Sequence, residues 1–118
     1  MKHVFETDAN NATINPLYIQ KNTSVETTTT DLRLHNNKIT DIGIEKLVPA
    51  LKEMKGMTYL SFGNNKITDV GIEKLVPALK EMKGMTYLDL YNNNITNAGK
   101  NQILEVCKSY KNVKRCAI

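Results

Sequence analysis

Residues 38–60 read KITDIGIEKLVPALKEMKGMTYL, and residues 66–88 read KITDVGIEKLVPALKEMKGMTYL. The second stretch repeats the first 28 residues later, and the two differ only where Ile42 is replaced by Val70. A period of this length is typical of solenoids, in which each unit buries its apolar face only by stacking on its neighbours. The sequence therefore predicts a stack of similar coils.

Asparagine sets the register of the repeat. Asn37, Asn65 and Asn93 lie 28 residues apart, and the pattern L-x-x-L-x-L-x-x-N-x-I runs around each of them. Leu60 and Phe62 are two residues apart, so they share one side of a short strand, which we expect to face the core. After Asn65 the chain must turn, and a buried amide there can bond backbone groups that the turn exposes. The three asparagines are therefore predicted to form a structural ladder.

A helix is expected after each strand, on the opposite side of the coil. Thr40 and Thr68, each followed by an aspartate, are helix-start signals, and apolar residues follow at helical spacing. Pro49 and Pro77 lie inside these segments, where proline removes a helix hydrogen bond, so we expect a kink or an irregular first turn there. The third helix is predicted over Asn97–Tyr110.

The last coil is expected to end in a short fourth strand over Val113–Ile118, because the apolar pattern continues there at the same period. This register places Cys107 and Cys116 inside the last coil. Two cysteines do not make a disulfide-framework protein, so we expect two reduced core thiols. A disulfide between them is geometrically possible but is not required.

The motif NxITDxGxxxLxxxLxxxxxLxxL at period 28, which runs through residues 29–118, resembles the ribonuclease-inhibitor-like class of leucine-rich repeats. The resemblance implies an α/β fold, namely a short curved solenoid with a parallel β-sheet on its concave side and helices on its convex side. Residues 29–118 would hold three repeats and the terminal strand, and residues 1–28 would form a partly irregular N-terminal cap. Similar repeats occur in NOD-like receptors, in regulators of small GTPases and in short effectors of intracellular bacteria, and nearly all of them act by binding proteins.

The strand residues that point away from the predicted core differ between coils, whereas the helix face barely changes. A varied face on a constant frame is typical of a binding surface, although exposed strand residues also drift without any partner. Tyrosines suit binding hot spots, and mixed charges suit a protein partner better than a nucleic acid. We predict that the partner-binding residues are Asp31, Arg33, His35, Asn36, Tyr59, Ser61, Asn64, Tyr87, Asp89, Tyr91 and Asn92.

Composition narrows the function classes. The 118 residues carry a net charge of +4 and contain neither an apolar stretch long enough to span a membrane nor a recognisable signal peptide. His3 and His35 are the only histidines, and no Gly-rich phosphate loop appears. We therefore expect a cytoplasmic protein that is not an enzyme and binds no metal, cofactor, nucleic acid or membrane. Its Asn-, Lys- and Ile-rich composition fits an AT-rich genome, which favours a bacterial effector or a protozoan protein. A specialised secretion system would deliver such an effector into a host cytosol.

The main hypothesis is a non-catalytic protein-binding module, monomeric when unbound, whose concave sheet docks on one protein. Its sharper form is an inhibitor that covers the active site of a partner enzyme. Tyr59, Tyr87 and Tyr91 would anchor the partner, and Arg33 and Asp89 would orient it. The alternative is a structural role, in which the open edge strand pairs with another chain.

Overall fold

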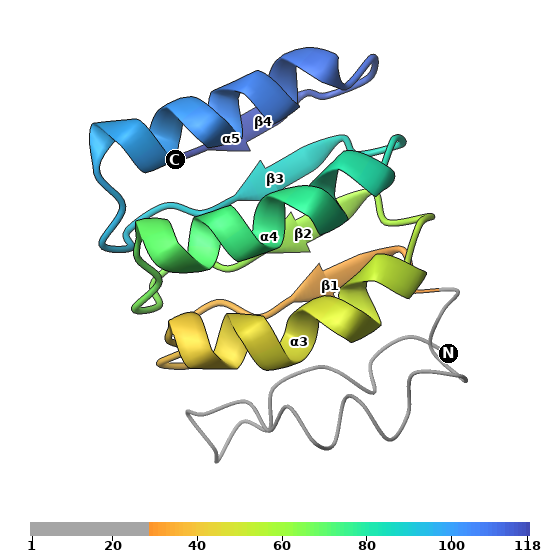
Figure 1. Cartoon of the computed structure of the whole chain (residues 1–118). Helices are drawn as coiled ribbons and strands as arrows, with labels where there is room; N and C mark the ends of the chain where they lie inside the picture. The colour runs from red at the N-terminus through yellow and green to blue at the C-terminus, as the bar shows by residue number, and fades with distance from the viewer. Residues whose placement is uncertain (1–28) are drawn as a thin grey trace.

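The computed structural model describes residues 29–118, and the cap predicted for residues 1–28 lies outside them. Strands and helices alternate along the described range and stack coil upon coil (Figure 1). In chain order they are β1 (Asp31–Arg33), α3 (Asp41–Glu53), β2 (Tyr59–Ser61), α4 (Asp69–Glu81), β3 (Tyr87–Asp89), α5 (Asn97–Ser109) and β4 (Arg115–Ala117).

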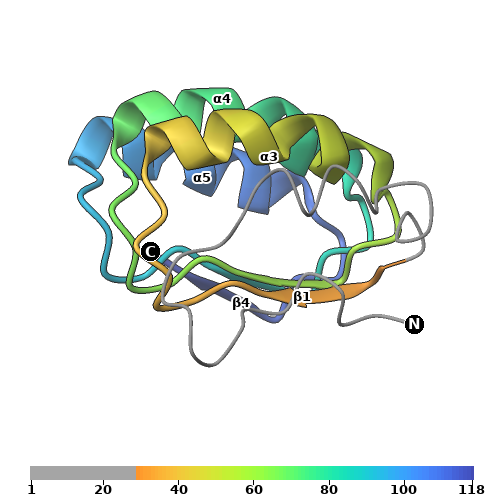
Figure 2. The ribbon, with the colours of Figure 1, turned by 90° about the horizontal axis from the view of Figure 1, so that it is seen from below.

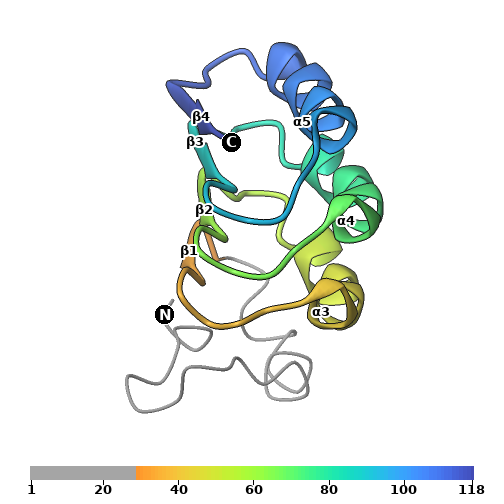
Figure 3. The same ribbon diagram turned by 90° about the vertical axis from the view of Figure 1, so that its left-hand side faces the viewer.

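The strands and the helices form two separate layers. The strands make a 4-stranded sheet in the order β1-β2-β3-β4, with every neighbouring pair parallel. The helices cover one face of this sheet, and within residues 29–118 no helix covers the other face (Figures 2 and 3). This arrangement confirms the predicted α/β solenoid, including the terminal strand, which spans Arg115–Ala117 within the segment expected to hold it.

The core lies between the two layers and is filled by the apolar positions of the repeat. Leu60, Phe62 and Leu88 have no exposed surface, and Leu75 and Leu79 meet them from α4 with none either. Because strand side chains alternate between the two faces, burial of Leu60 and Phe62 sends the intervening side chain to the free face. The predicted inward positions are therefore confirmed.

The asparagine ladder is present and bonds adjacent coils through their backbones. The side-chain oxygen of Asn65 accepts hydrogen bonds from the backbone N–H of Asn37 at 3.0 Å and of Ile39 at 2.9 Å. Its amide nitrogen donates to the carbonyl oxygens of Leu34 at 3.1 Å and Phe62 at 2.7 Å. One side chain thus satisfies buried backbone groups on two coils, which an apolar residue cannot do.

The ladder repeats one coil later, and its first asparagine, Asn37, is only partly hydrogen-bonded within the described range. The side-chain oxygen of Asn93 accepts from the backbone N–H of Ile67 at 3.0 Å, and its amide donates to the carbonyl oxygen of Leu90 at 3.0 Å. Asn37 donates to the carbonyl oxygen of His35 at 2.7 Å, but its buried side-chain oxygen has no donor among residues 29–118.

A second contact between coils joins the starts of the helices. The carboxylate of Asp41 accepts hydrogen bonds from the backbone N–H of Thr68 at 2.8 Å and from its hydroxyl. This carboxylate fills the space beside Gly71, where an added Cβ would lie 2.3 Å from the Asp41 Oδ1 atom. Asp69 binds Thr96 in the same way, and the Thr96 hydroxyl holds the pKa of Asp69 below its ordinary value. The T-D-x-G motif is therefore a contact between successive coils as well as a helix start.

The prolines do not interrupt their helices, so the expected irregular first turn is wrong. α3 remains helical from Asp41 to Glu53 through Pro49, and α4 does the same through Pro77. Both prolines are exposed on the outer side of the helix layer. The carbonyl of Glu45, which proline leaves without its helical donor, belongs to an exposed residue, so water can satisfy it.

The two cysteines form a disulfide, which corrects the expectation of reduced core thiols. Cys107 of α5 is bonded to Cys116 of β4, and their Cα atoms lie 6.8 Å apart. Cys107 faces the core from the helix layer, and β4 brings Cys116 opposite Leu88, so the two sulfurs meet inside the last coil. The bond ties the terminal strand to the last helix.

Replacement of Asn65 by alanine should strongly destabilise the fold. The substitution leaves the buried N–H groups of Asn37 and Ile39 and several carbonyls without partners, and each such group costs roughly 1–3 kcal/mol. We expect urea unfolding to report a loss of about 3 kcal/mol or more in the free energy of unfolding. Asn101→Ala, on the exposed face of α5, is the control and should change it by less than about 0.5 kcal/mol. Equal effects would refute the ladder.

Reduction of the Cys107–Cys116 bond should lower stability without abolishing the fold. The two residues are 9 positions apart. Opening a loop of this length restores chain entropy to the unfolded state worth about 2.5 kcal/mol. The wild type should therefore unfold at a lower urea concentration in dithiothreitol, whereas the Cys107→Ala/Cys116→Ala variant should not respond to the reductant. An unchanged wild type would contradict the bond.

Candidate functional site

The free face of the sheet is the candidate site, and we name it the strand face. It consists of the outward side chains of β1–β4 and of the turns that follow β1, β2 and β3. The register places Asp31, Tyr59, Tyr87 and Arg115 in one row across four strands. The adjacent row holds Arg33, Ser61, Asp89 and Ala117. Both rows follow the 28-residue period of the sequence, and β4 adds the last residue to each.

Two tyrosines form the centre of the strand face. The rings of Tyr59 and Tyr87 are stacked, with centroids 4.3 Å apart and planes inclined by 4°. The guanidinium of Arg33 lies 4.2 Å from the centroid of the Tyr59 ring, and that of Arg115 lies 5.9 Å from the centroid of the Tyr87 ring. The four side chains therefore form a continuous row, which we call the Arg–Tyr stack. Cation–π attraction and ring stacking stabilise such an arrangement.

Asp31 determines where Arg33 lies. Its carboxylate accepts hydrogen bonds from Nε of Arg33 at 2.9 Å and from an outer guanidinium nitrogen at 3.1 Å. Arg33 is in register with Ser61, but this two-point contact draws its guanidinium sideways over the ring of Tyr59. The pair is bidentate and therefore geometrically defined. Asp31 and Arg33, both predicted contact residues, thus hold one end of the stack.

Ser61 does not offer a free contact, which corrects its place among the exposed residues. It points to the strand face, but it is only 3% exposed. Its hydroxyl donates to the carboxylate of Asp89 at 3.2 Å, and the other oxygen of that carboxylate accepts from the backbone N–H of Tyr91 at 2.9 Å. The Asp89 side chain also covers Gly63. A partner would therefore meet Asp89 rather than Ser61.

The asparagines at the edge of the strand face have a structural reason to be there. Asn36, Asn64 and Asn92 have φ angles of 60°, 57° and 62°. Asparagine tolerates this left-handed conformation better than most residues. The side chain of Asn92 also donates to that of Asn64. Their recurrence is explained by the turn, and their role in partner binding remains a prediction.

Tyr91 and His35 are exposed members of the predicted site. Tyr91 is 59% exposed and follows β3, and His35 is exposed after β1. Tyr91 therefore offers ring surface to a partner, in contrast with the stacked Tyr59 and Tyr87. No cluster of three or more His, Cys, Asp or Glu residues that could hold a metal ion occurs within residues 29–118. Over the same range, no helix is long and apolar enough to cross a membrane.

Arg115 is the site residue that the sequence analysis missed. It lies opposite Tyr87 in β4 and closes the Arg–Tyr stack. The signal was available, because adding one period to Tyr87 gives Arg115.

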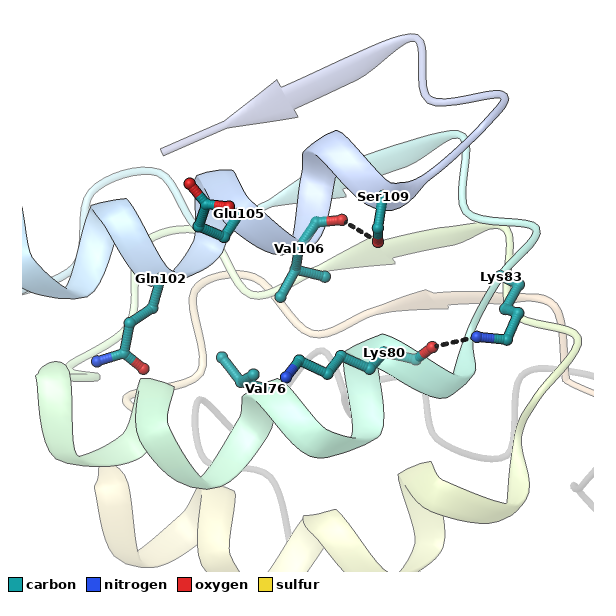
Figure 4. Close-up of a pocket in the computed structure, with 7 residues that line it drawn as sticks. All are labelled: Val76, Lys80, Lys83, Gln102, Glu105, Val106 and Ser109. Atoms are coloured by element: carbon teal, nitrogen blue, oxygen red, sulfur yellow. Dashed lines mark hydrogen bonds between the residues drawn. The ribbon is translucent and has the colours of Figure 1, made fainter.

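A groove on the helix layer is the other candidate surface. It lies between α4 and α5, has a volume of about 580 Å³, and is lined by Val76, Lys80, Lys83, Gln102, Glu105, Val106 and Ser109. Figure 4 shows Val76 and Val106 facing the groove from the two helices. Several polar groups there are already bonded locally: Lys83 donates to the carbonyl of Lys80, and Glu105 pairs with Lys108. The strand face offers the denser set of recognition groups.

Comparison with known proteins agrees with this geometry. The family described as "Leucine Rich repeat" matches residues 27–48 and 57–76. The fold is that of a short leucine-rich-repeat solenoid. Among solved structures, this repeat protein is similar to "Leiomodin-1 Actin-Binding Site 2 (ABS2)", with a TM-score of 0.70 and 21% identity. The match covers 91% of the present chain and 67% of the other. At this identity the likeness is one of fold. No curated protein matches the chain.

Loss of the Tyr59 hydroxyl should reduce the sensitivity of the fold to alkaline pH. Burial raises the pKa of Tyr59, and the hydroxyl of Tyr87 raises it further. A phenol whose pKa rises on folding stabilises the protein below its unfolded pKa of about 10, and this contribution is lost as pH rises through the folded pKa. Between neutral pH and about pH 11, the wild type should lose more stability to urea than Tyr59→Phe does. Equal losses would show that the phenol does not titrate this way.

Proposed function

We propose that the protein is a non-catalytic protein-binding module that uses its strand face. The observation that carries this proposal is the Arg–Tyr stack, which places aromatic and guanidinium groups on a rigid sheet without covering them by helices. Tyrosine and arginine are enriched at binding hot spots, and a site held on strands loses little entropy on binding. The leucine-rich-repeat architecture supports the proposal, because such solenoids present extended binding surfaces.

The structural neighbour is consistent with this class of function. It is described as an actin-binding site of leiomodin-1, which fits a protein-binding role for this fold. For the present chain we propose a protein partner without naming it, and we place the solenoid in the ribonuclease-inhibitor-like class on the strength of its 28-residue motif. The protein would be monomeric when unbound.

The sharper proposal is inhibition of a partner enzyme by covering its active site. With strands about 4.8 Å apart, four of them make a platform only about 15 Å across, which suits capping a cleft better than wrapping a globular partner. Tyr91, exposed at the edge of the platform, would enter the cleft, and the stack would rest on its rim. This mode of inhibition fits an effector that acts in the cytoplasm, either of its own cell or of a host cell. Disulfides are rare in that compartment, so the Cys107–Cys116 bond of the structure weighs against a cytoplasmic location.

A second candidate function follows from the exposed end of the solenoid. β4 pairs with β3 on one side and is the last strand of the sheet. Leu104 of α5 is 42% exposed at the repeat position that Val76 holds in α4, where it lines the groove between helices. An open strand edge beside an exposed leucine favours self-association, in which this end pairs with another chain.

The test is capture of a partner from the native cell lysate by the full chain. The Tyr87→Ala/Tyr91→Ala variant should lose the partner, because it removes half of the aromatic pair and the most exposed ring. Truncating hot-spot residues of this kind costs at least about 2 kcal/mol each, or roughly thirtyfold in affinity. Circular dichroism would verify folding, and Lys46→Ala/Lys74→Ala on the helix layer is the matched control.

Retention of the partner by the tyrosine variant would refute the strand face as the binding site. Sizing chromatography of the purified protein separates the second candidate. A dimer that disappears when Leu104 is replaced by glutamate, and that the tyrosine variant retains, would support self-association. If the partner is an enzyme, inhibition by the wild type but not by the tyrosine variant would support the sharper proposal.

A further inference from the structure

The Arg–Tyr stack covers both faces of the Tyr59 ring and one face of the Tyr87 ring. One face of the Tyr59 ring is covered by Arg33 at 4.2 Å and the other by the Tyr87 ring at 4.3 Å. The Tyr87 ring lies between Tyr59 and Arg115. A nucleobase, a sugar or a proline ring could stack here only by breaking the row. The groups left to a partner are the ring edges, the phenol hydroxyls and the outer guanidinium N–H groups, which are hydrogen-bond donors.

Charge on the strand face is unevenly compensated. Arg33 is neutralised by Asp31 through two hydrogen bonds. The Asp89 carboxylate accepts from Ser61 in β2 and lies against Gly63, so it leans towards β2 rather than towards β4. Arg115 accordingly has no ion pair among residues 29–118.

The same end of the strand face carries further positive charge. Lys111 and Lys114 lie in the segment between α5 and β4, are exposed, and have no carboxylate partner in the described part of the chain. The strand face therefore changes character along the row. It is internally paired at β1, presents hydroxyl donors at β2 and β3, and ends in uncompensated cations at β4.

We propose that this surface binds an acidic segment of a protein partner, lying along the row from Tyr59 through Tyr87 to Arg115. Carboxylates of the segment accept hydrogen bonds from the Tyr hydroxyls and a charge-assisted pair from Arg115, whose planar fork matches a carboxylate. Lys111 and Lys114 increase the rate of encounter through longer-range attraction. The Asp31–Arg33 pair limits the site at β1, because a carboxylate arriving there meets Asp31. This inference rests on the proposed use of the strand face.

The test uses a fluorescein-labelled peptide of alternating glutamate and serine, and its matched version with glutamine in place of glutamate. Fluorescence anisotropy at low ionic strength should show binding of the glutamate peptide to the full-length protein and at least tenfold weaker binding of the glutamine peptide. Arg115→Gln should weaken binding of the glutamate peptide by about tenfold, because a hydrogen-bonded charge pair is lost. Tyr59→Phe/Tyr87→Phe keeps the stacked rings and removes the hydroxyls, so it should also weaken binding.

Lys46→Gln is the matched control, because it removes one positive charge from the exposed side of α3. It should change the affinity by less than about twofold, since solvent screens distant surface charges. Equal affinity for the two peptides, or equal effects of Arg115→Gln and Lys46→Gln, would overturn the inference. Loss of binding in Lys111→Gln/Lys114→Gln but not in Arg115→Gln would also overturn it, because general attraction to a basic end would then suffice.

The captured partner distinguishes this inference from the proposed function. If Tyr87→Ala/Tyr91→Ala loses the partner and Arg115→Gln keeps it, the strand face binds a protein whose contact is not acidic. If the glutamate peptide displaces the partner from the wild type, the acidic segment and the partner occupy one site. If Tyr87→Ala/Tyr91→Ala keeps the partner while the glutamate peptide still binds the wild-type stack, the proposed function fails. The acidic-segment site is then supported independently of it.

Discussion

The hydrogen bonding of the asparagine side chains is the constraint on which the rest of the structure depends. Each coil must turn sharply out of its strand, and the turn leaves backbone donors and acceptors inside the protein. Asn65 satisfies groups on its own coil and on the coil before it, and Asn93 repeats the pattern. The spacing of the coils therefore follows the reach of one amide. The strand register, the row of tyrosines and the alignment of the helix starts all follow from that spacing.

Much of the fold was predictable because the repeat encodes it twice. The inward positions, the parallel register and the ladder depend on residues that recur at one period, so one coil predicts the next. Ser61 shows the limit of this reasoning. Its burial depends on the rotamer of Asp89, which neither the repeat period nor the alternation of strand side chains predicts. The repeat register placed Cys107 and Cys116 inside the last coil and left a disulfide possible. Whether the two sulfurs bond depends on how β4 packs against α5, which the spacing alone does not determine.

The candidate site was predicted as a set of positions but not as a structure. Tyr59 and Tyr87 could be placed in one row from their spacing. Their enclosure by guanidinium groups could not, because Arg33 reaches Tyr59 from a neighbouring row under the influence of Asp31. The outcome changes the chemistry of the surface. The rings of Tyr59 and Tyr87 would be expected to contact a partner directly. In the structure they are stacked and hold their hydroxyl groups in fixed positions, whereas the ring of Tyr91 is exposed.

The contact among Asp41, Thr68 and Gly71 has the same form as the contact among Asp69, Thr96 and Gly99. Each of these coils thus presents an aspartate on the side where the next coil presents a threonine and a glycine. A whole unit inserted between two coils would find matching partners above and below, and a deleted unit would leave matching ends. The array is therefore structurally open to growth and contraction in complete units. A 28-residue unit that includes residues 66–88 would bring another tyrosine into the row, and evolution can therefore lengthen the recognition surface without redesigning the fold.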